Sequence, residues 1–537
     1  MKIFMYSMAV IVMSQLSIGC DSTSHSTRNY EAEVKSLTLS ADSTIAQLPE
    51  EKITDKNNFN TEEYDNIVEN PFVTAEQQPL STFSIDVDRA AYSNVRRYIT
   101  EGSLPPRGAV RIEEMINYFN YTYPQPQNGE PFSVNTEIAA CPWNERHRLV
   151  HIGLKGKDID KTKLPSANLV FLVDVSGSME EANKLPLVQS SLKMLTSQLR
   201  EKDRVAIVTY AGNAGLVLPS VSGSEKMKIN EAIDALSAGG STAGEEGIKL
   251  AYKVAKENFM KEGNNRVILA TDGDFNVGVS SEDELVSLIE EERKSGVFLT
   301  VLGYGMGNYK DNKMQQLADK GNGNHAYIDN SSEARKVLVN EFGGTLFAIA
   351  KDVKLQVEFN PALTKAYRLI GYENRVMPNE DFNNDKKDAG ELGAGHTVTA
   401  LYEIIPVGVD DKFISKTDDL KYQQKRTINN DFSNELLTIK LRCKAPDGEV
   451  SKLITHPVTD DAAPVDQSSD NFRFSAAVAE FGLLLRKSDY KQQASYSQVI
   501  SLAKTSKGND EEGYRSEFIK LVETAAVLDD KKALSKN

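Results

Sequence analysis

The chain has 537 residues, which is too long for one ordinary hydrophobic core, so we expect two to four domains. Its hydrophobic fraction of 40% and its charged fraction of 26% are typical of a globular protein. The 77 acidic residues outnumber the 62 basic ones, which gives a net charge of −15 and argues against a general nucleic-acid-binding protein.

The first twenty residues have the composition of a secretion signal. Lys2 precedes an apolar segment that is short for a membrane span, and small residues surround Cys20. The segment Ser17-Ile-Gly-Cys20 resembles a bacterial lipobox, in which the cysteine is lipidated and becomes the first residue of the mature protein. We therefore predict a lipoprotein signal peptide at 1–20 and a lipid anchor on Cys20, with an ordinary signal peptide as the alternative.

Residues 21–69 are rich in Ser, Thr, Asn, Asp and Glu, which cannot form a core, so we expect a flexible spacer. An N-terminal flanking α+β region is expected at 70–165. There the run Ser84-Ile-Asp-Val87 predicts a short strand, and Asp88 is a candidate N-cap for the helix that follows. Residues 132–157 alternate between apolar and polar side chains, which predicts antiparallel strands.

The middle of the chain, at 166–350, has a different pattern of apolar residues. Buried apolar runs alternate with amphipathic segments, which is typical of a doubly wound, mainly parallel α/β sheet covered by helices on both faces. The apolar runs lie at 169–173, 205–208, 267–270 and 298–302. Ligands of such a sheet bind outside the carboxyl ends of its strands.

Asp174-Val-Ser-Gly-Ser178 follows the first of these runs. Because alternating residues point the same way, Asp174, Ser176 and Ser178 can face one point, while Gly177 lets the backbone bend. Oxygen ligands alone suit a hard divalent cation such as Mg²⁺. The motif therefore predicts part of a metal site.

Two further segments lie at the same kind of position. Ala238-Gly-Gly-Ser-Thr-Ala-Gly244 is a loop of small residues in which Thr242 offers a hydroxyl, and Asp272 directly follows another apolar run. With the Asp174 motif, these loops provide two carboxylates and three hydroxyls.

The order and spacing of Asp174, Ser176, Ser178, Thr242 and Asp272 resemble the metal-ion-dependent adhesion site of von Willebrand factor type A domains. That resemblance implies that the two serines bind the metal directly and that the two aspartates act mainly through coordinated water. Thr242 is then a direct or water-mediated ligand, depending on the conformational state. The last position is left for an acidic group of a protein partner. Mg²⁺ is the expected metal, and Mn²⁺ or Ca²⁺ also suits the site.

The C-terminal part, at 351–537, returns to alternating strands and ends in a helical tail. Apolar residues with helical spacing between Phe474 and Leu485 predict a stripe that packs on the core. The economical arrangement is one β-rich module built from both flanks, with the middle domain inserted in it. The segments Asn70-Pro-Phe-Val73 and Tyr367-Arg-Leu-Ile-Gly-Tyr-Glu-Asn-Arg375 resemble the flanking regions of a bacterial family of von Willebrand A lipoproteins.

Other chemistry is less well supported by the sequence. Cys141 and Cys443 are expected to be separate buried thiols rather than a disulfide. The motif Asp272-x-Asp274-x-Asn276 begins like a calcium loop, but Val277 stands where an EF-hand needs glycine. No phosphate-binding Gly-Lys-Ser/Thr motif follows the glycine-rich loop.

We therefore expect a lipoprotein of the cell envelope, facing the periplasm or the cell exterior. It would bind a protein partner through the metal, in adhesion or assembly and without catalysis. A metal-dependent regulatory clamp or chaperone component of an envelope stress system is the alternative. A metal-dependent hydrolase would need a general base, and the nearby Glu245 and Glu246 are expected to begin a helix, whose dipole favours carboxylates there.

Overall fold

The computed structural model describes residues 61–160, 163–241, 244–273, 282–341, 347–387, 389–414, 432, 434–446 and 448–534. The predicted signal peptide, the lipidation site Cys20 and Thr242 lie outside these residues. None of the helices in these ranges combines the length and apolar character that a membrane crossing needs.

The middle domain is built on a six-stranded sheet with the strand order β10-β9-β8-β5-β6-β7. Its neighbours run parallel except for β7, which is antiparallel to β6. The strands are β5 (Ala167–Asp174), β6 (Arg204–Tyr210), β7 (Ala214–Ser222), β8 (Asn264–Thr271), β9 (Val297–Tyr304) and β10 (His325–Ile328). This confirms the predicted doubly wound, mainly parallel sheet.

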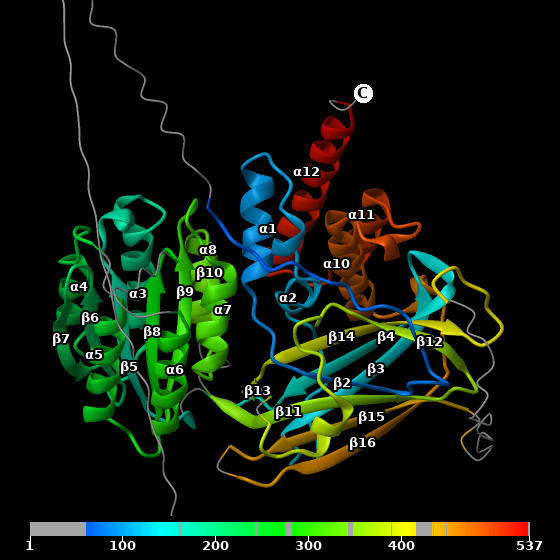
Figure 1. Ribbon diagram of the computed structural model, residues 1–537, viewed down its shortest axis with the longest axis horizontal. Coiled ribbons are helices and arrows are strands. Elements are labelled where there is room, and N and C mark those ends of the chain that lie inside the picture. The colour runs from blue at the N-terminus through cyan, green and yellow to red at the C-terminus, as the bar shows by residue number, and fades with distance from the viewer. Residues whose placement is uncertain are drawn as a thin grey trace, which may run out of the picture. The chain divides into compact units, whose positions relative to one another are not determined.

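Helices cover both faces of this sheet (Figure 1). One face packs against α3 (Leu185–Gln198), α4 (Lys226–Asp234) and α8 (Ser331–Arg335), and the other against α5 (Gly244–Glu257), α6 (Glu282–Glu292) and α7 (Asp311–Lys320). Successive side chains of β5 alternate between the two hydrophobic cores, with Phe171 in one and Leu172 in the other. Every residue of β5 is buried, which explains the continuous apolar run at 169–173 within it.

The flanks form a β module of two packed sheets. One has the strand order β1-β12-β14-β4-β3, and the other β13-β11-β15-β16, with β2 also paired to β11. The strands are β1 (Val73–Thr74), β2 (Leu80–Ser84), β3 (Phe132–Cys141), β4 (Asn144–Gly156), β11 (Ala348–Phe359), β12 (Thr364–Ile370), β13 (Gly390–Gly393), β14 (Thr397–Pro406), β15 (Glu435–Lys444) and β16 (Lys452–Thr459). Because β4 pairs with β14 and β2 with β11, strands from before and after the middle domain share both sheets, as predicted.

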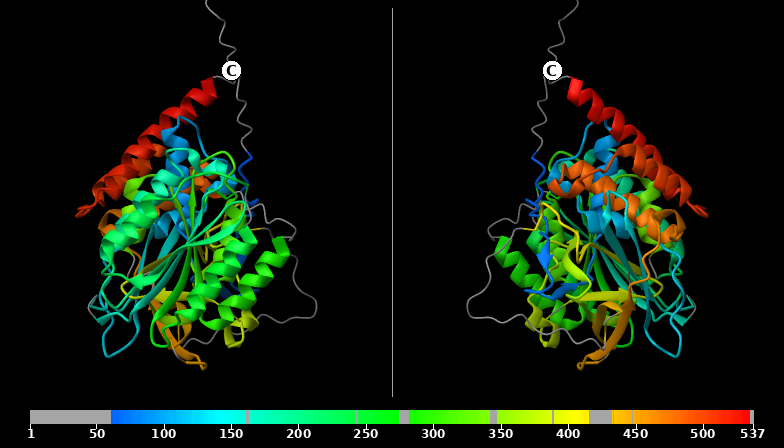
Figure 2. Two further views of the ribbon diagram at one scale, coloured as in Figure 1. Left: turned by 90° about the vertical axis from the view of Figure 1, so that its left-hand side faces the viewer. Right: turned by 90° about the vertical axis from the view of Figure 1, so that its right-hand side faces the viewer.

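A layer of helices covers the outer face of the first of these sheets (Figures 1 and 2). The helices are α1 (Ala90–Thr100), α2 (Ile112–Asn117), α10 (Asp470–Arg486), α11 (Tyr496–Thr505) and α12 (Tyr514–Leu534). Trp143 is fully buried in the core between this layer and the sheet. Nearly all of the circumference of α10 is buried, mainly against α2 and α11, so this helix buries more than the single stripe that was predicted.

Three local expectations differ from the structure. The strand predicted at 84–87 is β2, which already ends at Ser84. Asp88 is not the N-cap of α1, because its buried carboxylate accepts a hydrogen bond from the backbone N–H of His325, at 2.8 Å, across the domain boundary. The predicted spacer reaches residue 69, yet residues 61–69 belong to the folded unit, since Glu62 forms a buried ion pair with Arg97. Cys141 and Cys443 are separate buried thiols, as expected.

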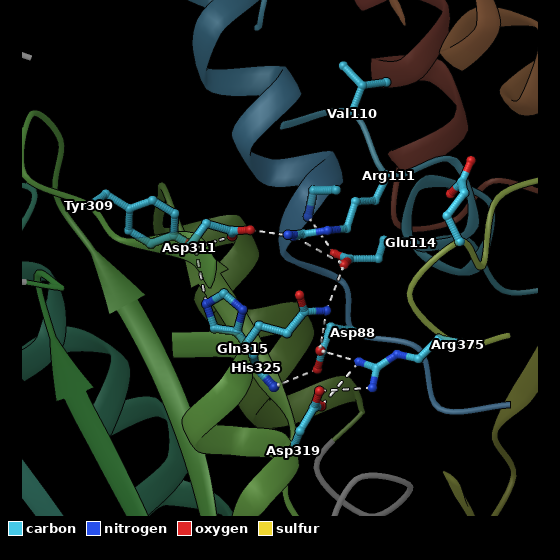
Figure 3. A network of polar contacts seen from close by, with 12 residues as sticks. Asp88, Val110, Arg111, Glu114, Tyr309, Asp311, Gln315, Asp319, His325 and Arg375 are labelled. Carbon is cyan, nitrogen blue, oxygen red and sulfur yellow. Dashed lines mark hydrogen bonds and ion pairs between the residues drawn. The ribbon is translucent and has the colours of Figure 1, made fainter. Parts of the chain in front are cut away.

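A network of buried charges joins the middle domain to the flanks (Figure 3). The Arg375 guanidinium, from the segment after β12, lies 3.2 Å from Asp88 and 2.9 Å from Asp319 of α7. Arg111, just before α2, forms an ion pair with Asp311 at the start of α7. Both ends of α7 are therefore fixed to the flanks, which also fixes the loop that precedes this helix.

Candidate metal centre

The first part of the candidate site is the turn that follows β5. Asp174 is fully buried, and its Oδ1 accepts a hydrogen bond from the Ser176 backbone N–H at 2.9 Å. Its Oδ2 accepts from the hydroxyls of Tyr210, at 3.1 Å, and Thr271, at 3.3 Å, which lie on the neighbouring strands β6 and β8. The Oγ atoms of Ser176 and Ser178 are 3.1 Å apart. The carboxylate orientation is thus fixed by donors from three strand ends.

The glycine-rich loop packs directly on this turn. Gly239 donates its backbone N–H to Val175 O at 2.8 Å, and Gly177 donates to Gly240 O at 3.1 Å. Gly240 has a φ of +87°, a left-handed conformation that favours glycine. Thr242 lies outside the described residues, so its place in the site stays a prediction, although the loop that leads to it reaches the Asp174 turn.

Asp272 forms the second part of the site, at the end of β8. It is fully buried, and its Oδ2 accepts hydrogen bonds from the Lys184 ammonium at 3.1 Å and from the Asn308 amide at 3.0 Å. Neither of these donors was predicted from the sequence. Asn308 follows β9 at the same edge of the sheet, so the strand-end rule that found Asp272 could have found it. Lys184 precedes α3, and nothing in its spacing pointed to the site.

The two carboxylates have opposite pKa shifts. Burial raises the pKa of Asp174 to about 6, and the nearby charge of Asp272 adds to this, against the hydrogen bonds from Ser176. Burial acts in the same direction on Asp272, but the hydrogen bond from Asn308, the charge of Lys184 and the Ser178 hydroxyl together lower its pKa. Both groups are therefore mainly ionised at neutral pH.

The loop that carries Asn308 is fastened by residues 61–64, which we call the N-terminal strap. Thr61 donates its backbone N–H to Gly307 O at 2.7 Å, and Glu63 donates to Tyr309 O at 3.1 Å. The Glu62 carboxylate accepts from the Gly307 N–H at 2.9 Å and also pairs with Arg97 of α1 at 2.7 Å. The strap is thus joined by backbone hydrogen bonds to a loop of the candidate site.

The donor set fits a hard divalent cation. In an octahedral Mg²⁺ site, adjacent oxygen ligands are about 2.9 Å apart, which is close to the observed separation of the Ser176 and Ser178 Oγ atoms. Counting only described residues, the buried Asn308 Oδ1 atom beside Asp272 has no hydrogen-bond partner, so it offers a further oxygen acceptor there. Over the described part of the chain, no three His, Cys, Asp or Glu side chains cluster as metal ligands, so this site depends on hydroxyl groups.

Comparison with known proteins identifies the middle domain by its class. Residues 168–341 match the family described as "von Willebrand factor type A domain", and residues 58–151 match a family described as "von Willebrand factor". Residues 344–528 match "Uncharacterized protein YfbK, C-terminal". The protein therefore contains a von Willebrand factor type A domain between two flanking regions.

Most of the chain is similar to a bacterial protein. The Escherichia coli K12 protein YfbK is 44% identical over 495 residues, which cover 91% of this chain and 85% of YfbK. The chain belongs to the YfbK family. The Synechocystis protein sll0103 is 29% identical over 197 residues, covering 36% of this chain and 45% of that protein. Human inter-alpha-trypsin inhibitor heavy chain H3 is 24% identical over 253 residues, or 44% of this chain and 28% of the heavy chain.

Among solved structures, the von Willebrand factor type A protein from Catenulispora acidiphila is similar at 13% identity and a TM-score of 0.38, covering 83% of this chain and 89% of that one. BatB from Bacteroides thetaiotaomicron is similar at 20% identity and a TM-score of 0.29, covering 33% of this chain and 97% of that one.

Proposed function

We propose that this protein is a lipid-anchored envelope protein that binds a protein partner through a divalent cation, in adhesion or assembly. The observation that carries the proposal is the convergence of Asp174, Ser176, Ser178 and Asp272 at one edge of the central sheet. Thr242, which follows the described residues of the glycine-rich loop in sequence, is the further ligand of the proposed set. The occurrence of this constellation in a von Willebrand factor type A domain supports a binding role.

Each residue has a distinct role in this proposal. Ser176 and Ser178 would hold the cation through neutral hydroxyls, while the two aspartates would hold it mainly through water. The bound cation supplies a hard positive centre for a carboxylate of the partner, since neutral ligands leave part of its charge uncompensated. Tyr210 and Thr271 orient Asp174, and Asn308 orients Asp272.

We propose that the site binds and does not catalyse. The two carboxylates considered as a general base lie in the first turn of α5, where the helix dipole favours them. Glu245 also forms an ion pair with Lys249, one turn further along the helix, at 2.5 Å. Turnover of ester, amide or phosphate substrates that depends on Mg²⁺ and is lost in Glu245→Gln would overturn this part of the proposal.

Metal binding is tested by titrating the protein with Mn²⁺ and Mg²⁺ in a calorimeter. We expect Asp174→Asn, which keeps the side-chain shape, to weaken binding at least about tenfold, because a ligand-orienting negative charge is lost from a buried site. Asp234→Asn is the matched control, since Asp234 is an exposed carboxylate of the same domain paired with Lys193. Equal affinity in wild type and Asp174→Asn contradicts the metal site.

The partner is tested by cross-linking in intact cells followed by mass spectrometry. We expect proteins that are cross-linked to the wild type, and whose cross-links are lost in Asp174→Asn or when a chelator is added. Cross-links that persist in both conditions contradict metal-dependent binding. The anchor is tested separately, because a mature N-terminus that carries no lipid or begins after Cys20 refutes it.

A further inference from the structure

Lys184 places a third charge inside the candidate metal centre. It is 4% exposed, and its ammonium lies 3.1 Å from Asp272 Oδ2. The side chain crosses directly over Gly305, where an added Cβ would come within 2.5 Å of Lys184 Cε. Gly305 also has a φ of +75°, so both the backbone conformation and the close approach favour glycine there. The site is shaped around this lysine.

The charge of Lys184 is little screened, because the ammonium and its partner carboxylate are both removed from water. It neutralises one of the two aspartates by pairing with Asp272 Oδ2, an oxygen that also accepts a hydrogen bond from the neutral Asn308 amide. A divalent cation that enters beside it meets one uncompensated carboxylate instead of two. Once loaded, the centre carries a net single positive charge, whereas without the lysine it would be neutral.

We propose that Lys184 is a positioning residue that lowers the affinity of the centre for the metal and raises the affinity of the bound metal for its partner ligand. It weakens the binding of the divalent cation and strengthens the hold of the bound cation on an anionic carboxylate from a partner. This inference rests on the proposed metal site and specifies the chemistry of its sixth ligand. A site of this kind selects against neutral ligands such as amides and hydroxyls.

Two substitutions separate the charge of Lys184 from its volume. Lys184→Met keeps a long unbranched side chain over Gly305 and removes the ammonium, while Lys184→Arg keeps the charge. Lys193→Met, in the helix α3 that follows Lys184, is the matched control, because Lys193 is partly exposed and pairs with Asp234 at the surface. Circular dichroism and thermal unfolding establish that each variant folds.

The first measurement is the dissociation constant for Mn²⁺, from the free-ion signal in electron paramagnetic resonance. We expect Lys184→Met to bind Mn²⁺ about tenfold more tightly than wild type, because a nearby like charge is removed, and Lys193→Met to be unchanged. If wild type binds and Lys184→Met binds equally or more weakly, the inference about Lys184 is wrong while the metal site stands. If neither protein binds Mn²⁺, the metal site itself is refuted.

The second measurement uses acetate as the carboxylate probe on the Mn²⁺-loaded proteins. Acetate that displaces water from the ion lowers the water-proton relaxation rate, which gives an apparent acetate affinity. We expect this affinity to fall severalfold in Lys184→Met and to be retained in Lys184→Arg. Acetate binding that is equal or tighter in Lys184→Met overturns the proposed effect on the partner ligand.

Discussion

Glu480 is a buried carboxyl group that forms no ion pair with any basic side chain in the described part of the chain. It lies in α10 and is fully buried, with Oε1 accepting a hydrogen bond from the Ser495 backbone N–H at 3.0 Å. Within the described ranges, its Oε2 has no hydrogen-bond partner. Burial raises the pKa of Glu480 to about 8, so the protonated form is the one that suits the folded protein.

The sign of the resulting pH dependence follows from this pKa. Stability contributed by protonated Glu480 is fully present below the unfolded value near pH 4.5 and is lost as the pH rises through 8. We expect Glu480→Gln, which keeps the acceptor for Ser495, to exceed wild type at pH 9 by about 4 kcal/mol in the free energy of unfolding. Urea denaturation at pH 5 and pH 9 measures the difference. The exposed Glu523→Gln is the control, and parallel pH profiles for wild type and Glu480→Gln contradict the prediction.

The residues of the candidate site were only partly predictable from the sequence. Asp174 is the last residue of one buried strand and Asp272 directly follows another. The carboxyl ends of such strands meet at one sheet edge, so a local pattern was sufficient. Lys184 was not predictable, because its contact with Asp272 spans 88 residues and depends on how α3 lies over the sheet. The spacing of apolar residues along the sequence carries no information about such a contact.

At the scale of elements, local patterns predicted the helices and strands better than the N-terminal strap. Buried strands can be recognised in the sequence by continuous apolar runs, such as residues 169–173 of β5, because both faces of the strand are covered. The strap has the polar composition of the segment before it. It is ordered by distant partners, the Arg97 guanidinium and the backbone of the loop at 307–309, which a sequence window does not contain.

The strap is expected to stabilise the loop of the candidate site that carries Asn308. Glu62→Gln removes the charge that pairs with buried Arg97 and weakens the bond to the Gly307 N–H. We expect faster amide hydrogen exchange over residues 305–310 and a loss of roughly 3 kcal/mol in the free energy of unfolding, because a buried charge loses its partner. Glu76→Gln is the control, since that side chain is exposed and lies outside the strap. Unchanged exchange at Gly307 in Glu62→Gln contradicts this role.

At the scale of the whole molecule, the β module requires both flanks of the chain. Strand β4 pairs with β14, from Thr397 opposite Lys155 to Ile404 opposite Arg148, although the middle domain lies between them in sequence. The alternating patterns indicated such a module. They did not indicate the strand order or the helical layer over it, which follow from long-range packing around residues such as Trp143.

The charge network around Arg375 is expected to couple the middle domain to this module. Arg375→Met leaves Asp88 and Asp319 facing each other without a compensating cation. We expect the free energy of unfolding to fall by roughly 3 kcal/mol, because one partner of a buried ion network is removed. Limited proteolysis and urea denaturation measure the effect. Arg146→Met is the control, since Arg146 is mostly exposed, and equal stability of Arg375→Met and wild type contradicts the coupling.

The strap also sets how far the candidate site can range from a membrane. Thr61 is hydrogen-bonded to the loop of the site, so on the proposed anchor at Cys20 the chain between them is about 40 residues and spans at most about 140 Å. One partner molecule held in the same membrane within that radius then meets the site at an effective concentration on the order of 0.1 mM. A single metal–carboxylate contact with a dissociation constant on that order would be half occupied under these conditions.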